Sequence, residues 1–259
     1  MIIVDHETGS VVLVIRGTFS PKDVIMDGVC EEAEFLDGYA HAGFLSGAKK
    51  VMQKCSSILE QSLRDNFGYN LVICGHSMGG SVAVLITMQL LRNDECSILP
   101  PGVRVRCVAL APAPVYRTHG SIPALYLDNI HIYVNDKDCV PTLSLGSVAK
   151  LLAVLREIDN VGLSLDQQLA IIMCRQDYDT VAARSRVSRA VNSVDQTSFQ
   201  YLHHPGTMMR CVTRGQSVKI VSLTQEQAQA MAENLLIFES MVSDHIHTTY
   251  RENFLKIEP

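Results

Sequence analysis

Hydrophobic positions along the chain form two kinds of pattern that alternate with each other. Short apolar runs with the length of buried strands lie at 11–15, 71–74, 103–110, 130–134, 208–212 and 218–223. Between several of them, apolar residues recur at helical spacing, as in 44–63 and 78–92. This alternation predicts an α/β fold, with a mostly parallel central sheet flanked by helices.

The beginning of the chain predicts a hairpin, because 2–4 and 11–15 are separated by the turn-forming sequence Glu7-Thr8-Gly9. The helix expected over 44–63 has one buried face. That face consists of Phe44, Ala48, Val51, Met52, Cys55, Leu59 and Leu63. The strand at 71–74 is expected to be buried on both faces.

The pattern changes between residues 143 and 200, which predicts an insertion within a single domain spanning 1–259. Two helices are expected there, at 148–158 and 165–174, followed by a polar stretch at 184–198 in which arginines alternate with serines. One interpretation is a helix packed on the core and then a solvated loop; the other is a mobile cover over the active site. Helical spacing returns from 225 to 241 and again after 247.

Composition limits the possible functions. The 259 residues are 47% hydrophobic, enough for one large core, and the net charge of −5 argues against nucleic acid as a partner. The first ten residues lack the features of a secretory signal, and no apolar stretch reaches membrane-spanning length. Cys74 and Cys107 lie within apolar runs, which indicates reduced thiols. A cytoplasmic protein that contacts membranes peripherally is therefore expected.

The strongest chemical feature is the sequence Gly75-His76-Ser77-Met78-Gly79, followed by Gly80, between the strand at 71–74 and the helix at 78–92. A G-x-S-x-G sequence between a strand and a helix predicts a nucleophile elbow, in which Ser77 occupies a strained turn and the glycines avoid collisions. The N–H of Met78, at the start of the helix, is the expected donor to an oxyanion. Ser77 is therefore the candidate nucleophile.

A serine nucleophile needs a base and an acid, which in this fold follow it in the order acid, then histidine. Asp136 and Asp138 both follow the apolar run 130–134 and are both candidates for the acid. The candidates for the base are the four later histidines, His203, His204, His245 and His247. No residues stand at convincing metal-ligand spacing, so no metal is expected.

Several motifs in the expected order resemble the class 3 (fungal-type) lipases. They are Val14-Ile15-Arg16-Gly17-Thr18-Phe19-Ser20, Tyr39-Ala40-His41-Ala42-Gly43-Phe44 and the elbow. The sequences Ser20-Pro21-Lys22-Asp23 and Asp136-Lys137-Asp138-Cys139-Val140-Pro141 resemble the sn-1-specific diacylglycerol lipase branch.

The resemblance implies roles for particular residues. Thr18 would complete the oxyanion hole with Met78, and Asp138 rather than Asp136 would be the acid. The sequence His203-His204-Pro205-Gly206 resembles a structural strand entry. Asp244-His245, with Tyr250, resembles the element that carries the base, and His245 also lies in a turn between two helical segments.

The implied activity is hydrolysis of a fatty-acyl ester of an acylglycerol, with diacylglycerol as the expected substrate, without a cofactor and at a membrane or lipid-droplet surface. A phospholipase A1, a galactolipase or a general carboxylesterase is an alternative, because a triad does not encode the head group. A catalytically silent lipid-binding module with a lipase fold is the alternative outside the enzymes.

Overall fold

The computed structural model describes residues 1–17, 31–92, 98–172, 178–195, 199–215, 217–235 and 238–257. The chain divides into two units. The first consists of Met1–Ser144 and Leu202–Pro259, and the second of Leu145–Tyr201. The second unit covers the region expected as an insertion, and its role as a cover stays a prediction.

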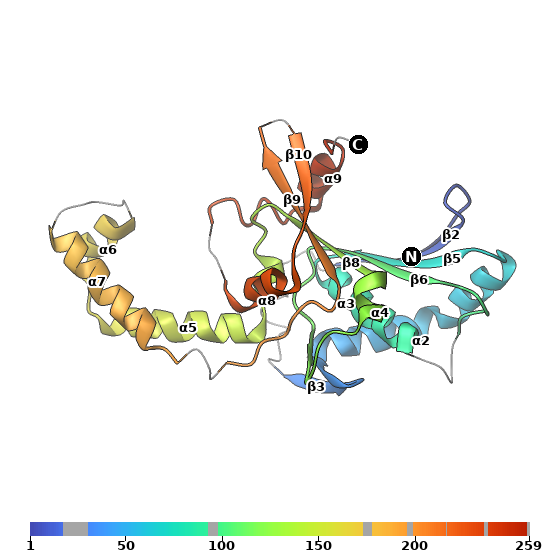
Figure 1. Ribbon diagram of the computed structural model, residues 1–259, viewed down its shortest axis with the longest axis horizontal. Helices are drawn as coiled ribbons and strands as arrows, with labels where there is room; N and C mark the ends of the chain where they lie inside the picture. Colours follow the sequence, from blue (N-terminus) through green and yellow to red (C-terminus); the bar gives the residue numbers. More distant parts are fainter. Residues whose placement is uncertain are drawn as a thin grey trace. The chain divides into compact units, whose positions relative to one another are not determined.

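A seven-stranded sheet forms the centre of the first unit (Figure 1). Its strands are β1 (Ile2–Asp5), β2 (Ser10–Ile15), β5 (Asn70–His76), β6 (Val105–Leu110), β8 (Ile130–Asn135), β9 (Thr207–Arg214) and β10 (Ser217–Ser222), in the order β1-β2-β5-β6-β8-β9-β10. The five strands β2, β5, β6, β8 and β9 are parallel, and β1 and β10 pair antiparallel at the two edges. The predicted α/β fold with a mostly parallel sheet is confirmed.

Helices α2 (Ala42–Asp65), α3 (Met78–Arg92) and α4 (Ala124–Asn129) lie on one face of this sheet (Figure 1). Leu71 and Ile73 of β5 point to that face and are fully buried. Val72 and Cys74 point to the other face and are only half-buried. The prediction that this strand is buried on both faces is therefore wrong, because the helices that follow β2, β5 and β6 do not cover its second face.

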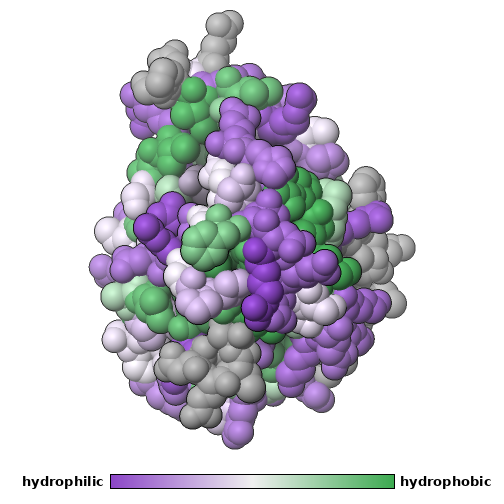
Figure 2. Space-filling view, turned by 90° about the vertical axis from the view of Figure 1, so that its right-hand side faces the viewer, coloured by the Kyte–Doolittle hydropathy of each residue, from purple (hydrophilic) through white to green (hydrophobic). Residues whose placement is uncertain are grey.

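The second face of the sheet carries helix α9 (His247–Phe254) near the carboxyl ends of the strands. Phe254 packs edge-on against Tyr133 of β8, with ring centroids 5.3 Å apart. On the side of the molecule shown in Figure 2, hydrophobic residues lie in patches between hydrophilic ones. Helix α9 thus brings the C-terminal segment to the edge of the sheet where β5 and β8 end.

Some elements were not predicted from the sequence. Strands β3 (Glu32–Phe35), β4 (Gly38–His41) and β7 (Tyr116–Thr118) form a second, antiparallel sheet. These strands have only three or four residues each, too few for a periodic pattern to stand out. Helix α8 (Gln225–Glu233) ends earlier than the helical spacing to residue 241 had indicated.

The second unit contains α5 (Leu145–Asn160), α6 (Leu165–Ile172) and α7 (Tyr178–Ser193). The interpretation of 184–198 as a solvated loop is wrong for residues 184–193, which belong to α7, while 196–198 lie outside the described residues. Arginine and alanine have high helix propensity, which favours a helix here even though the segment has few apolar residues. The buried side of α7 includes the small residues Thr180 and Ala183, so the helix can pack without large apolar side chains. Residues 173–177, which include the end of the helix predicted for 165–174, also lie outside the described residues.

Candidate active site

Ser77 lies in the tight turn between β5 and α3, as the elbow motif predicts. Its φ of +57° is in the left-handed region, which a side chain other than glycine's adopts only under local constraint. A Cβ at Gly75 would come within 2.4 Å of the backbone of Gly79, and one at Gly79 within 2.3 Å of the carbonyl oxygen of Ile15. The two glycines therefore allow β2, β5 and α3 to meet closely enough to form the turn.

Asp138 follows the end of β8 and is buried, with 3% of its surface exposed. Its carboxylate accepts hydrogen bonds from the backbone N–H of Val140 at 2.9 Å and from the hydroxyl of Tyr250 at 2.8 Å. Both of its oxygens lie 3.0 Å from Nδ1 of His245. Asp136 occupies a different position: its backbone N–H donates to Cys211 of β9, and its carbonyl accepts from Arg210. Of the two candidate acids, the structure brings Asp138 to His245.

His245 lies in the turns between α8 and α9. Its Nε2 is 3.0 Å from Oγ of Ser77, while its Nδ1 faces Asp138. His247 is the first residue of α9 and is exposed, and its ring centroid lies 6.4 Å from that of His76. Ser77, His245 and Asp138 thus form one hydrogen-bonded chain, with the geometry required for a base to deprotonate the serine while an acid orients it.

Tyr250 of α9 is fully buried beside this chain. Burial, followed by the nearby Asp138 charge, raises the pKa of Tyr250 well above its usual range, so the phenol stays protonated and donates to Asp138. Its oxygen also accepts the backbone N–H of Asn135 at 2.8 Å. From the sequence, Tyr250 stood out only through its place in the element around His245, which does not reveal a contact with the acid.

His76, His203 and His204 differ from one another in their surroundings. Burial, followed by the charge on His245, lowers the pKa of His76. His204 is fully buried, with Nε2 2.8 Å from the carbonyl oxygen of Pro141, and burial lowers its pKa to about 4. The backbone of His203 pairs with Tyr116 of β7. His203 and His204 therefore tie strands and loops together, and the structure does not bring them to Ser77.

The remaining expected site residues lie around the elbow. Met78 and Gly80 belong to the first turn of α3, and Thr18 lies outside the described residues. Within the described ranges, no three His, Cys, Asp or Glu side chains come together as metal ligands. The described cysteines, Cys55, Cys74, Cys107, Cys139 and Cys211, are free thiols. None of the helices seen in the described ranges is long and apolar enough to cross a membrane.

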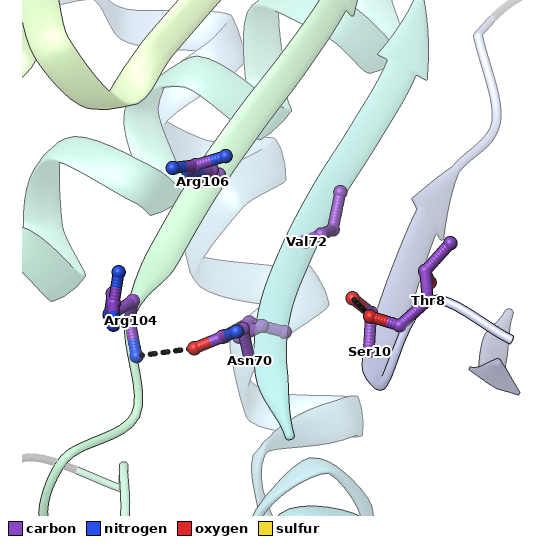
Figure 3. A pocket seen from close by; sticks show the side chains of 7 residues that line it. Thr8, Ser10, Asn70, Val72, Arg104 and Arg106 are labelled. Atoms are coloured by element: carbon purple, nitrogen blue, oxygen red, sulfur yellow. Dashed lines mark hydrogen bonds between the residues drawn. The ribbon is translucent and has the colours of Figure 1, made fainter. Parts of the chain in front are cut away.

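A pocket of about 280 Å³ lies at the opposite end of the strands, away from Ser77. Its lining comes from the first turn of the chain and from the amino ends of β2, β5 and β6 (Figure 3). The lining residues are Thr8, Ser10, Asn70, Leu71, Val72, Arg104 and Arg106. None of these seven lining residues is a histidine, a cysteine or a carboxylate, so the candidate for chemistry is the end of the sheet with Ser77.

Comparisons with known proteins point to one family. The profile of the class 3 lipases matches residues 12–148, just over half of the chain. Diacylglycerol lipase-beta of Mus musculus is 33% identical over 98 residues, which are 35% of this chain and 15% of that protein. Secreted mono- and diacylglycerol lipase A of Penicillium cyclopium is 36% identical over 92 residues, which are 34% of this chain and 30% of that protein. The aligned part thus spans less than a third of either relative.

Solved structures support the fold. The lipase of Rhizopus microsporus var. chinensis aligns with a TM-score of 0.57 and 17% identity, over 94% of this chain and 67% of its own. The Rhizomucor miehei lipase–propeptide complex aligns with a TM-score of 0.58 and 16% identity, over 95% of this chain and 62% of its own. At this level of identity the agreement concerns the α/β-hydrolase architecture alone.

Proposed function

The chain belongs to the class 3 lipase family, and from this premise we propose that it hydrolyses a fatty-acyl ester of an acylglycerol, with diacylglycerol as its substrate. The proposed catalytic residues are Ser77, His245 and Asp138. The observation that carries the proposal is the hydrogen-bonded chain formed by these three side chains, in which both contacts of the imidazole measure 3.0 Å.

Acylation begins when Oγ of Ser77 attacks the ester carbonyl carbon. Nε2 of His245 takes the hydroxyl proton and then gives it to the oxygen of the leaving alcohol. Asp138 holds the imidazole with Nδ1–H toward the carboxylate and stabilises the imidazolium that forms. Water then attacks the acyl-enzyme with the same histidine as base, and the fatty acid leaves.

The tetrahedral intermediate needs donors for its oxyanion. We assign this role to the backbone N–H of Met78, at the positive end of α3, and to Thr18, which the family resemblance implies. One such donor typically lowers the barrier by about 3 kcal/mol, roughly 100-fold in rate.

The substrate assignment rests on the names of the relatives that align with this chain, which include diacylglycerol lipases from mammals and fungi. The triad itself does not distinguish an acylglycerol from a phospholipid. The names of these relatives have in common the hydrolysis of an ester of glycerol.

Labelling with a fluorophosphonate probe tests the catalytic machinery. We expect covalent modification of Ser77 in the wild-type protein and none in Ser77→Ala, because the probe requires an activated serine. Folded wild-type protein that does not react would favour a lipid-binding module without turnover.

A substrate panel tests the choice of lipid. We expect diacylglycerol in mixed micelles to release fatty acid much faster than phosphatidylcholine or galactolipid at matched surface concentration. Equal or faster release from phosphatidylcholine would refute the diacylglycerol assignment and leave the serine hydrolase in place.

A further inference from the structure

Two side chains hold successive carbonyl groups of the turn that carries His245. Nε2 of His76 lies 2.9 Å from the carbonyl oxygen of His245, and Nδ2 of Asn135 donates to the carbonyl oxygen of Asp244 at 3.0 Å. His76 immediately precedes Ser77, and Asn135 ends the strand that leads to Asp138. The turn that carries His245 is therefore hydrogen-bonded to β5, which leads to Ser77, and to β8, which leads to Asp138.

In the hydrogen bond between Asn135 and Asp244, the side-chain amide of Asn135 can only be the donor. Asn135 is buried, and its Oδ1 accepts a hydrogen bond from Nδ2 of Asn253 at 2.7 Å. Its own Nδ2 is therefore left to donate to the carbonyl of Asp244. The contact made by His76 depends on its protonation, because a carbonyl oxygen can only accept and Nε2 must carry the proton.

The environment of His76 favours the neutral ring. Its ring centroid lies 4.7 Å from that of His245, and among the described residues Asp138, His247 and Tyr250 also lie close to it. Burial and the charge that His245 acquires both lower the pKa of His76. A neutral ring with its proton on Nε2 can hold the carbonyl of His245 without adding a positive charge beside the imidazolium that forms during acylation.

We propose that His76 is a positioning residue, whose Nε2–H holds the backbone of His245 at the distance from which the imidazole reaches Ser77. The inference rests on the proposed serine-hydrolase function, and it assigns a role to the residue between Gly75 and Ser77 in the elbow. A general base works only within hydrogen-bond reach of its proton donor, and a displacement of about 1 Å can lower the rate about 100-fold.

The competing explanation is that His76 only fills space beneath the rings of His245 and Tyr250. Two substitutions separate these roles. In His76→Gln, the side-chain amide nitrogen can donate from about the position of Nε2, whereas His76→Phe keeps a ring of similar size and has no donor.

Steady-state kinetics on a soluble short-chain ester measures the effect. We expect His76→Phe to lower kcat by about 10- to 100-fold with KM changed less than about twofold, because the substrate still binds while the base is displaced. His76→Gln should retain kcat within about threefold of the wild type. His247→Phe is the matched control, because it replaces a neighbouring imidazole that is exposed. Within the described residues, His247 makes no hydrogen bond to Ser77 or Asp138, so this substitution should leave kcat unchanged.

Two outcomes would overturn the proposal: His76→Phe with kcat within threefold of the wild type, or His76→Gln as impaired as His76→Phe. If His76→Phe does not fold, His76→Met replaces it, with the same expected loss. Nitrogen NMR of the imidazoles in the wild type gives a second readout, in which His76 should be neutral with its proton on Nε2 near neutral pH. A proton on Nδ1 would also contradict the proposal, whereas a wild type that neither turns over ester nor reacts with fluorophosphonate would contradict the proposed function instead.

Discussion

Replacing Tyr250 with phenylalanine removes one oxygen atom from the most buried part of the site. That oxygen donates to Asp138 and accepts the backbone N–H of Asn135, each at 2.8 Å. Tyr250 is 1% exposed, so water has no access to replace either contact. Tyr250→Phe therefore keeps the ring and its packing and deletes two buried hydrogen bonds.

The two losses can be estimated separately. A hydrogen bond to a charged group contributes about 1.5 to 3 kcal/mol, and a buried N–H left without an acceptor costs about 1 to 3 kcal/mol. Partial relaxation around Asn135 lowers the sum, so we expect a decrease of about 3 kcal/mol in the free energy of unfolding. Asp138 keeps its contacts with Val140 and His245. Turnover of the folded fraction should therefore fall less than about tenfold.

Urea unfolding, followed by circular dichroism at pH 7, measures the stability change. Tyr133→Phe is the matched control, because Tyr133 lies on the same face of the sheet and packs against Phe254, and its hydroxyl has no hydrogen bond to the residues that the structure describes. We expect this control to change the free energy of unfolding by less than about 0.5 kcal/mol. A decrease below 1 kcal/mol for Tyr250→Phe, or an equal effect of both substitutions, would refute the reasoning.

Three further predictions follow from the site and the fold. His245→Ala should lower turnover by a factor on the order of 10⁴ and His247→Ala should leave most of it, as measured on a short-chain ester; the reverse result in folded proteins would assign the base to His247. Burial lowers the pKa of His204 to about 4, so below about pH 6.5 the unfolded chain binds more protons at this residue than the folded chain does. The free energy of unfolding should therefore decrease as the pH falls from 6.5 toward 4, by up to about 3 kcal/mol. His204→Gln should flatten this dependence in thermal unfolding measured from pH 7 to 4.5, and an unchanged slope would exclude His204 as its source. If the second unit acts as a cover, replacing residues 178–193 with a short linker should raise turnover of a soluble ester, and unchanged turnover in a folded variant would argue against that role.

Local patterns in the sequence determined much of the fold. Apolar runs and helical spacing predicted the central strands and helices α2 and α3, because the side-chain period of an element and its buried face are properties of neighbouring residues. The elbow motif placed Ser77 between β5 and α3 for the same reason. Local patterns failed for the three short strands of the second sheet and for residues 184–193, where packing against α5 and α6 stabilises a helix of low apolar content.

The arrangement of the candidate site depended on contacts between distant parts of the chain. His245 is 168 positions from Ser77 and 107 from Asp138, and sequence spacing alone left two carboxylates and four histidines as candidates. The parallel sheet brings the ends of β5 and β8 to one edge, and α9 then packs on its second face, so Tyr250 meets Asp138 and the turn before α9 delivers His245. The hold of His76 and Asn135 on that turn involves backbone carbonyls, which every residue carries, so only the tertiary structure could decide which carbonyls meet these side chains.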